Sequence, residues 1–333
     1  MSELLRLAYS TLFPVTTQLA LSPELTRFLS EGGRAILFGE DGAEYATGVM
    51  RPDRVIEETA EKWRTVTRNV RELAGNALVA LDADISAVHR LHRLTAPLPT
   101  RNEAHGIGLD EFERRIEAMA RDARELGVNL LLSPTADVVA GQNPWLAGRT
   151  LADDIDGASR LVSAYVRGVK RAGIASTLKH FPGNPVITGS PATEVAHVPL
   201  TMSALRPYLA PFKAGIDAGA DAVFLSPALF DALSPPKSGS TSPELIRLLR
   251  KELAFAGLVI TCDLDHRSTM VDKDLGEVVV EALEAGADLL VLSPAASPHL
   301  DVLARQIERA VGEGRLPLER LKAASAAVDR ASV

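Results

Sequence analysis

The chain has almost no cysteine, since Cys262 is the only one among its 333 residues. A single thiol cannot form an internal disulfide, and it cannot build a metal site made of cysteines. Proteins of reducing compartments commonly lack disulfides, so we expect a cytoplasmic protein. Residues 1–22 agree with this expectation, because their apolar stretch has neither the basic start nor the small-residue cleavage site of a secretory signal.

Two further absences exclude classes of partner. No stretch reaches the roughly 18 uninterrupted apolar residues of a membrane-spanning helix, so we expect no membrane insertion. The net charge is -7, and lysine and arginine are scattered among acidic residues instead of forming a basic stripe. Nucleic-acid binding depends on such a stripe, so nucleic acid is not an expected partner.

Short apolar runs recur along the chain, each followed by polar residues and then by a segment with helical spacing. Seven runs are visible, at residues 34–39, 76–84, 128–138, 174–183, 221–227, 258–265 and 287–294. They lack polar–apolar alternation, which is typical of parallel strands that are buried on both faces. Between them lie amphipathic helical segments such as residues 110–127.

This alternation of strands and helices predicts a parallel α/β fold. Seven visible strands in about 300 residues suit a (β/α)8 TIM barrel of a single domain, residues 1–333, with a core at about residues 30–300. A doubly wound open sheet is the alternative, and it predicts a glycine-rich turn after the first strand. The turn after residues 34–39 reads FGEDGAEYATG and lacks the G-x-G-x-x-G spacing, so we favour the barrel.

Polar residues gather where several predicted strands end, and TIM-barrel active sites are formed at these ends. A lysine such as Lys179, at the end of an otherwise apolar strand, needs an acid or a polyhydroxyl ligand to satisfy its charge. Some of these residues also have a purely structural interpretation: Asp82 can cap a helix, and Cys262 can be a small buried apolar group. The residues concerned are Asp82, Asp84, Arg149, Lys179, His180, Cys262, Asp263, Asp265 and His266.

Several segments, in this order, resemble motifs of the N-terminal domain of glycoside hydrolase family 3, particularly of bacterial β-N-acetylglucosaminidases. STLKHFPGN (176–184) is similar to the family's K-H-F-P-G-H-G, and ALDAD with VHRL (80–91) is similar to I-D-x-E-G-G-x-V-x-R-L. GVNLLLSPTADV (127–138) and NPWLAGRTLADD (143–154) resemble two further family motifs. The resemblance covers about residues 30–300, and it is more specific for the fold than for the activity.

The resemblance implies retaining hydrolysis of a terminal β-linked hexose or N-acetylhexosamine, by an aspartate nucleophile and a separate acid/base. It implies no cofactor and no metal, and a carbohydrate or a glycosylated small molecule as the ligand. Carried over position by position, the residues that match the sugar-holding side chains of the family are Asp82, Arg149, Lys179 and His180. Two further candidates for substrate binding are Asp84 and His266.

The nucleophile position departs from the family pattern. VITCDLDH (259–266) stands where the family has V-I-x-[ST]-D-x-L, so an ungapped comparison places Cys262 at the nucleophile and Asp263 one residue later. A shift of one residue brings Asp263 into place, but it reverses the side-chain direction along a strand unless a bulge absorbs it. We prefer Asp263 as the nucleophile, and the alternatives are no nucleophile at all or Cys262.

The acid/base loop differs as well. After K-H-F-P-G the family has H-G and later Asp-x-His, whereas this chain reads NPVITGSPATEVAHVPL (184–200). Alignment on Pro199 places Thr193 and Val195 at the Asp and His positions, with Glu194 and His197 beside them. Either of these neighbours could transfer a proton after a rearrangement of the loop, and either could equally be a surface residue.

Three functions remain open at this point. The first is a divergent glycosidase with Asp263 as nucleophile and His197 or Glu194 as proton donor. The second is a catalytically degenerate protein that binds a sugar without cleaving it. The third is a family 3 barrel repurposed for other chemistry on a glycosylated small metabolite, with the residues at 262–266 as a new acid/base set.

Overall fold

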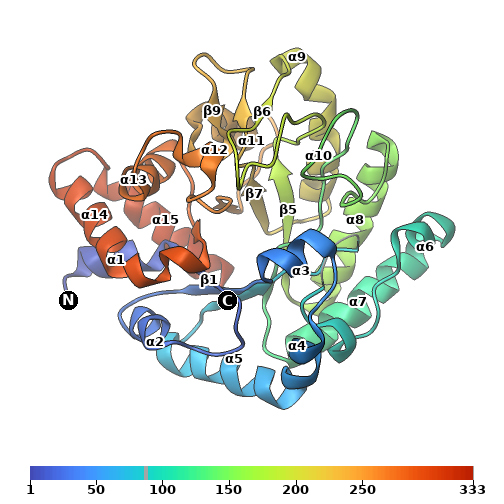
Figure 1. The fold of residues 1–333 in the computed structure, drawn as a ribbon, viewed down its shortest axis with the longest axis horizontal. Coiled ribbons are helices and arrows are strands. Elements are labelled where there is room, and N and C mark those ends of the chain that lie inside the picture. The colour runs from blue at the N-terminus through green and yellow to red at the C-terminus, as the bar shows by residue number, and fades with distance from the viewer. Residues whose placement is uncertain (86–88, 333) are drawn as a thin grey trace.

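The computed structural model describes residues 1–85 and 89–332, and its centre is a ring of eight parallel strands (Figure 1). The order around the ring is β10-β7-β5-β4-β3-β2-β1-β11, and a parallel bridge between Ile260 and Leu289 joins its two ends. The predicted TIM barrel is therefore confirmed. The strands are β1 (Leu12–Thr16), β2 (Ala35–Phe38), β3 (Leu78–Leu81), β4 (Leu130–Leu131), β5 (Ala175–Phe181), β7 (Ala222–Leu225), β10 (Leu258–Ile260) and β11 (Leu290–Leu292).

The first strand lies outside the core expected from the sequence. Each of the seven apolar runs contains one strand, and the eighth is β1, which pairs with β11 on one side and with β2 on the other. The N-terminal helix α1 (Glu3–Ser10) contacts the C-terminal helices α14 (Leu300–Gly312) and α15 (Leu318–Ala331). The barrel thus begins before residue 30 and is completed by helices beyond residue 300.

Two apolar layers hold the barrel together. The inner layer fills the ring and includes Phe13, Leu37 and Ile260, whereas the outer layer lies between the strands and the surrounding helices. Both faces of each strand are therefore buried, which explains the absence of alternation in the sequence. The helices between the strands are α2 (Pro23–Ser30), α3 (Gly42–Thr47), α4 (Pro52–Glu57), α5 (Ala60–Ala74), α6 (Arg101–Gly106), α7 (Leu109–Glu125), α8 (Ile155–Ala172), α9 (Met202–Leu205), α10 (Ala210–Asp217), α11 (Pro243–Lys251), α12 (Arg267–Met270) and α13 (Leu275–Ala285).

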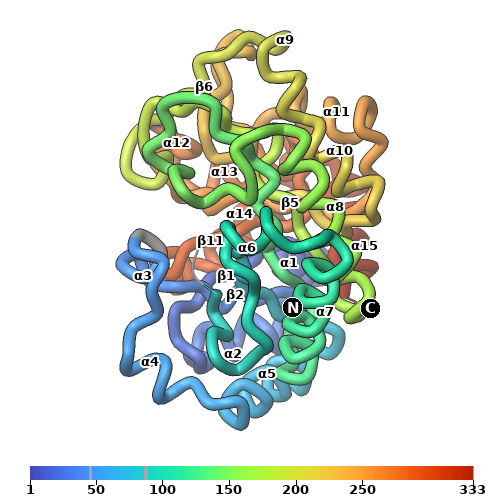
Figure 2. The backbone as a smooth tube through the Cα atoms, turned by 90° about the vertical axis from the view of Figure 1, so that its right-hand side faces the viewer, coloured from blue at the N-terminus to red at the C-terminus, as the bar shows by residue number. Residues whose placement is uncertain are grey.

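A second, three-stranded sheet belongs to the loops that follow the barrel strands. It consists of β6 (His197–Val198), β8 (Leu229–Phe230) and β9 (Lys237–Ser238), with α12 against β9. Figure 1 and Figure 2, two views at right angles, both place β6 and α12 at the same end of the molecule. Within the part of the chain that the structure describes, no helix has both the length and the apolarity to cross a membrane.

Candidate active site

A cavity of about 750 Å³ opens at the C-terminal ends of the barrel strands. It is where the chemistry of a TIM barrel is expected, because the loops after the strands converge there. Asp84 lies behind its wall, in contact with Lys179. The residues expected from the sequence that line this cavity are Asp82, Arg149, Lys179, His180, Cys262, Asp263 and His266.

The ammonium of Lys179 is shared by two carboxylates at the end of β3. Its Nζ atom contacts Asp82 Oδ1 and lies 2.5 Å from Asp84 Oδ2. Asp84 also accepts hydrogen bonds from the backbone N and the hydroxyl of Thr135, at 3.2 and 3.3 Å. The side chain of Asp82 is 16% exposed, against 3% for Asp84, so Asp82 is the carboxylate that a ligand can reach.

An irregularity in β5 brings two successive residues to the same cavity. In a regular strand, neighbouring side chains point to opposite faces. The pairing of β5 with β7 shifts its register between Lys179 and Phe181. As a result, Lys179 and His180 both line the cavity.

The imidazole of His180 is held firmly from two sides. Asp137 Oδ2 accepts a hydrogen bond from the backbone N of His180 at 2.7 Å and lies 2.8 Å from the ring Nδ1. The ring packs against Trp145, with centroids 4.5 Å apart, and edge-on against Phe224 at 5.9 Å. Burial lowers the pKa of His180 and outweighs the opposing effect of Asp137, so the ring is neutral near pH 7.

Trp145 forms an aromatic wall of the cavity. Its backbone oxygen accepts a hydrogen bond of 3.2 Å from Arg149 Nη1, and the Arg149 guanidinium lies 6.0 Å from the centroid of its ring. The indole thus contacts both Arg149 and His180. A flat aromatic surface beside charged donors suits a sugar, which presents apolar C–H faces and polar edges.

The residues after β10 form a compact cluster. Cys262 Sγ lies 3.7 Å from Asp263 Oδ2 and 3.7 Å from His266 Nδ1, and His266 Nε2 lies 3.6 Å from Asp263 Oδ2. Leu258, Ile260 and Cys262 all belong to the inner layer of the barrel, so the thiol continues the inward-facing series. Asp263 nevertheless reaches the cavity beside it.

The environment of this cluster favours the carboxyl over the thiol as a nucleophile. Burial raises the pKa of the Cys262 thiol well above its usual range, and the adjacent Asp263 raises it further. A neutral thiol is a weak nucleophile. Burial also raises the pKa of Asp263, while the nearby His266 opposes this change. Asp265 is turned away to Ser293, whose backbone N donates to its carboxylate at 3.2 Å.

The same cluster has the composition of a zinc site. Cys262, Asp263 and His266 each offer one ligand atom, and these atoms lie within 4.8 Å of one another. Sulfur, oxygen and nitrogen are the ligands that Zn²⁺ accepts in proteins. A metal held here would occupy Asp263 and so would compete with its use as a nucleophile.

The two expected proton donors lie near the cavity without lining it. Ser190 and Thr193, on the same loop, are part of the wall, but Glu194 and His197 are not. Glu194 Oε1 accepts a hydrogen bond of 2.9 Å from the backbone N of Ser190. His197, in β6, places its Nδ1 2.6 Å from Asp231 Oδ1, and about a third of its side chain is exposed.

Glu40 is a cavity residue that the sequence interpretation did not include. It follows β2 and lines the wall, and its Oε1 atom is buried without a hydrogen-bond partner among the residues that the structure describes. Burial and the neighbouring Asp82 raise the pKa of Glu40 to about 8. The available signal was an acidic residue directly after an apolar strand, the same signal that identified Asp82.

A family comparison matches most of the chain. The model of the glycosyl hydrolase family 3 N-terminal domain covers residues 43–331. The chain belongs to glycosyl hydrolase family 3. A β-hexosaminidase of Xanthomonas campestris pv. campestris (strain B100) is 30% identical over 243 residues, which are 71% of this family 3 chain and 72% of that protein. A β-hexosaminidase of Stenotrophomonas maltophilia (strain K279a) is 29% identical over 223 residues, 65% of this chain and 66% of that protein.

Solved structures share the barrel of this family 3 protein. A family 3 β-N-acetylglucosaminidase from Paenibacillus sp. str. FPU-7 superposes with a TM-score of 0.86 at 24% identity, over 99% of this chain and 62% of that one. A β-N-acetylhexosaminidase from Beutenbergia cavernae DSM 12333 superposes with a TM-score of 0.85 at 21% identity, over 100% of this chain and 99% of that one. At these identities the superpositions establish the fold. The matches span about two thirds of the two curated relatives, and the resemblance to family 3 is confirmed.

Proposed function

We propose that this barrel is a glycosidase that removes a terminal β-linked hexose or N-acetylhexosamine with retention of configuration. The observation that supports it best is the meeting of Asp82, Arg149, Lys179 and His180 around one cavity beside Asp263. Charged donors and acceptors of this kind hold sugar hydroxyls strongly. The β-hexosaminidase names of the relatives favour the same substrate class.

Asp263 is the proposed nucleophile. Its carboxylate attacks the anomeric carbon while the bond from that carbon to the leaving oxygen breaks, and a proton donor protonates the oxygen. A covalent sugar–Asp263 ester results. A water molecule then attacks the anomeric carbon and gives its proton back to the deprotonated proton donor. The bond between the sugar and Asp263 breaks, which releases the sugar and restores the Asp263 carboxylate.

His197 is the proposed proton donor, with Glu194 as the alternative. The contact of His197 Nδ1 with Asp231 orients the imidazole and leaves Nε2 for proton transfer. Glu194 instead uses its carboxylate to hold the backbone of its own loop. Because Thr193 of this loop already lines the cavity, a local movement of the loop would bring His197 to the leaving oxygen.

Aryl glycosides test this proposal directly. We expect release of nitrophenol from p-nitrophenyl N-acetyl-β-glucosaminide or p-nitrophenyl β-glucoside. Asp263→Asn should lower kcat/KM by about a thousandfold or more, and His197→Asn by about a hundredfold or more. Cys262→Ser is the matched control beside the nucleophile and should keep most of the activity. Equal activity of the wild type and Asp263→Asn would remove Asp263 from the mechanism.

Cys262 favours a second candidate function. The thiol occupies the inward-facing position after Ile260, where the ungapped comparison places the family nucleophile, and it is neutral near pH 7. A barrel that has lost its nucleophile in this way could bind a sugar without cleaving it. Calorimetric binding of N-acetylglucosamine, lost in Lys179→Ala, together with no turnover of either aryl glycoside, would favour this second function.

A further inference from the structure

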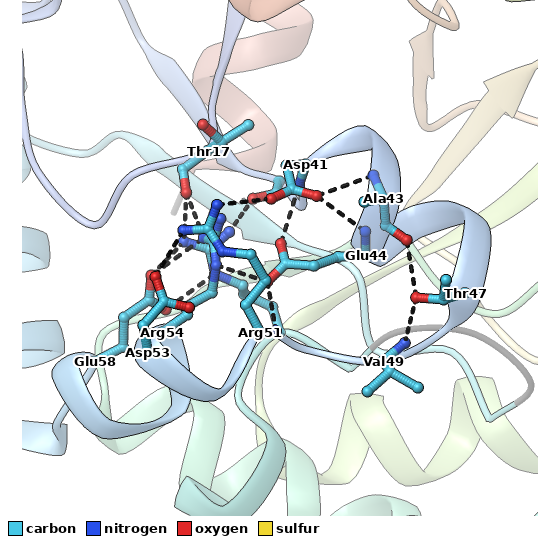
Figure 3. A network of polar contacts seen from close by, with 12 residues as sticks. Thr17, Asp41, Ala43, Glu44, Thr47, Val49, Arg51, Asp53, Arg54 and Glu58 are labelled. Atoms are coloured by element: carbon cyan, nitrogen blue, oxygen red, sulfur yellow. Dashed lines mark hydrogen bonds and ion pairs between the residues drawn. The ribbon is translucent and has the colours of Figure 1, made fainter.

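The loop that follows Glu40 is held by hydrogen bonds of its own side chains, and Figure 3 shows those of Asp41 and Glu44. Asp41 Oδ1 accepts hydrogen bonds from the backbone N of Ala43 and of Glu44, both at 2.9 Å, and so caps α3. Glu44 Oε2 in turn accepts a bond of 3.0 Å from the backbone N of Asp41. This reciprocal capping box holds the residue that follows Glu40. The position of Glu40 at the cavity wall is therefore determined by the fold.

The two buried arginines near this loop are already paired with other carboxylates. Arg54 lies 2.9 Å from Glu44 and 3.2 Å from Glu58, and both side chains of each pair are buried. Arg90 makes a two-pronged contact with Glu58, from Nε at 3.1 Å and from Nη2 at 2.7 Å. Two buried cations thus face two buried anions. Both arginines are thus paired with carboxylates other than Glu40, and the remaining effect of Arg90 on Glu40 is weaker than that of burial.

The lysine of the cavity contacts Asp82 and Asp84, and its effect on the pKa of Glu40 is weaker than that of burial. Glu40 Oε1 is buried and has no hydrogen-bond partner within the described ranges 1–85 and 89–332. Burial and Asp82 raise the pKa of Glu40 to about 8, against the weaker opposing effects of Arg90 and Lys179. Glu40 is therefore a neutral acid at pH 7 as long as no cation lies beside it.

We propose that Glu40 and Asp82 together hold the ammonium group of an amino sugar, so that the preferred ligands are glycosides with a free amine. This inference rests on the proposed function of the cavity as a sugar site. An ammonium group brings three N–H donors and a positive charge. Asp82 shares its one lysine with Asp84, and Glu40 Oε1 has no hydrogen-bond partner among the described residues, so both carboxyls can accept from such a group. A hydroxyl or an acetamido group brings no charge and would leave Glu40 protonated.

Binding of the amine changes the protonation of the protein by one proton. The ligand enters as an ammonium ion and keeps its charge. The Glu40 carboxyl releases its proton to the solvent and becomes the carboxylate of a charge-assisted hydrogen bond. A neutral sugar bound at the same place leaves the number of bound protons unchanged. The proton count therefore distinguishes the two kinds of ligand without any substitution in the protein.

Calorimetry measures this count. Glucosamine and 6-amino-6-deoxyglucose are titrated into the wild-type protein at about pH 6.5, where the amines are charged and Glu40 is protonated, in two buffers of different ionisation enthalpy. Glucose and N-acetylglucosamine serve as the neutral ligands. We expect at least one amine to bind about tenfold more tightly than either neutral sugar, with release of about one proton.

Two matched substitutions assign the effect to Glu40. Glu40→Gln keeps the shape of the side chain and should abolish both the preference for the amine and the proton release. Glu57→Gln makes the same change on an exposed residue of the neighbouring helix α4 and should preserve both. Amines that bind no better than neutral sugars, or without proton release, would overturn this inference and leave the proposed function intact. A protein that binds no sugar and cleaves no aryl glycoside would overturn both.

Discussion

Lys179 carries much of the electrostatic balance at the mouth of the barrel. It is a buried cation between two carboxylates, one of them almost fully enclosed. A buried ion pair of this kind adds little to folding stability when it is compared with apolar residues in place of all its members. Removal of only one partner, however, leaves a buried charge without compensation. We therefore expect the lysine to be needed for stability as well as for its proposed contact with a ligand.

Substitution of Lys179 by methionine tests this role. We expect Lys179→Met to lower the free energy of unfolding by about 3–5 kcal/mol, because Asp82 and Asp84 lose their shared cation. Denaturation in urea measures the change. The double variant Lys179→Met/Asp84→Asn should regain part of the loss, since it also removes the more enclosed carboxylate. If Lys179→Met were as stable as the wild type, Asp82 and Asp84 would not need the lysine for compensation of their charges.

The proposed role of Asp263 as nucleophile predicts the pH dependence of hydrolysis. A nucleophile must be ionised, and burial raises the pKa of this carboxyl. Activity should therefore fall on the acidic side through a pKa above about 4, the value of an ordinary aspartate. A profile of kcat/KM against pH measures this limb. His266→Ala should move the limb to still higher pH, because the imidazole lowers the pKa of Asp263. An acidic limb with a pKa at or below about 4, the value of an ordinary aspartate, would contradict the role of Asp263 as nucleophile.

Arg149, in the long loop after β4, was found through the family resemblance. Other candidates found from the sequence, such as Asp82, lie on or soon after a strand, and a parallel strand determines where its last residue points. Glu40 met the same criterion, but its properties depend on burial and on Asp82, which is distant along the chain. The loop residues Glu194 and His197 could be placed only by spacing. Spacing fixes the order of residues along a loop and leaves the direction of their side chains open.

Among the strands of the barrel, β1 is the one that the sequence did not reveal. Its five residues, LFPVT, include a proline and follow an apolar N-terminal helix closely. A proline within a short apolar run argues against a strand inside a sheet. Here the run becomes a strand because β11 and β2 provide pairing partners on both sides. Such partners cannot be read from a local pattern.

Phe13 provides a test of the importance of β1. Its side chain is fully buried in the inner layer of the barrel. We expect Phe13→Ala to lower the free energy of unfolding by about 3–5 kcal/mol, through lost burial and a cavity. Val302→Ala, on the exposed face of α14, is the control and should change it by less than about 0.5 kcal/mol. A small effect at Phe13, measured by thermal or urea unfolding, would mean that β1 contributes little.

For the whole molecule, the fold was more predictable than the function. The repeated strand–helix pattern indicated a barrel because few other arrangements bury so many parallel strands on both faces. Hydrophobic spacing revealed seven of the eight strands, which was enough to indicate a closed ring. The cavity depends on side chains from β2, β3, β5 and β10 that meet only after the ring closes. Their mutual distances and charges have no counterpart in the linear sequence.

The position of β1 between β11 and β2 also has a consequence for biosynthesis. The ribosome makes β1 long before β11, so β1 has both of its partners only once β11 has been made. Until then the nascent chain carries β1 with one edge unpaired, and such edges invite pairing with other chains. The ring can therefore close only after β11 has been synthesised, which makes its completion a late event in folding.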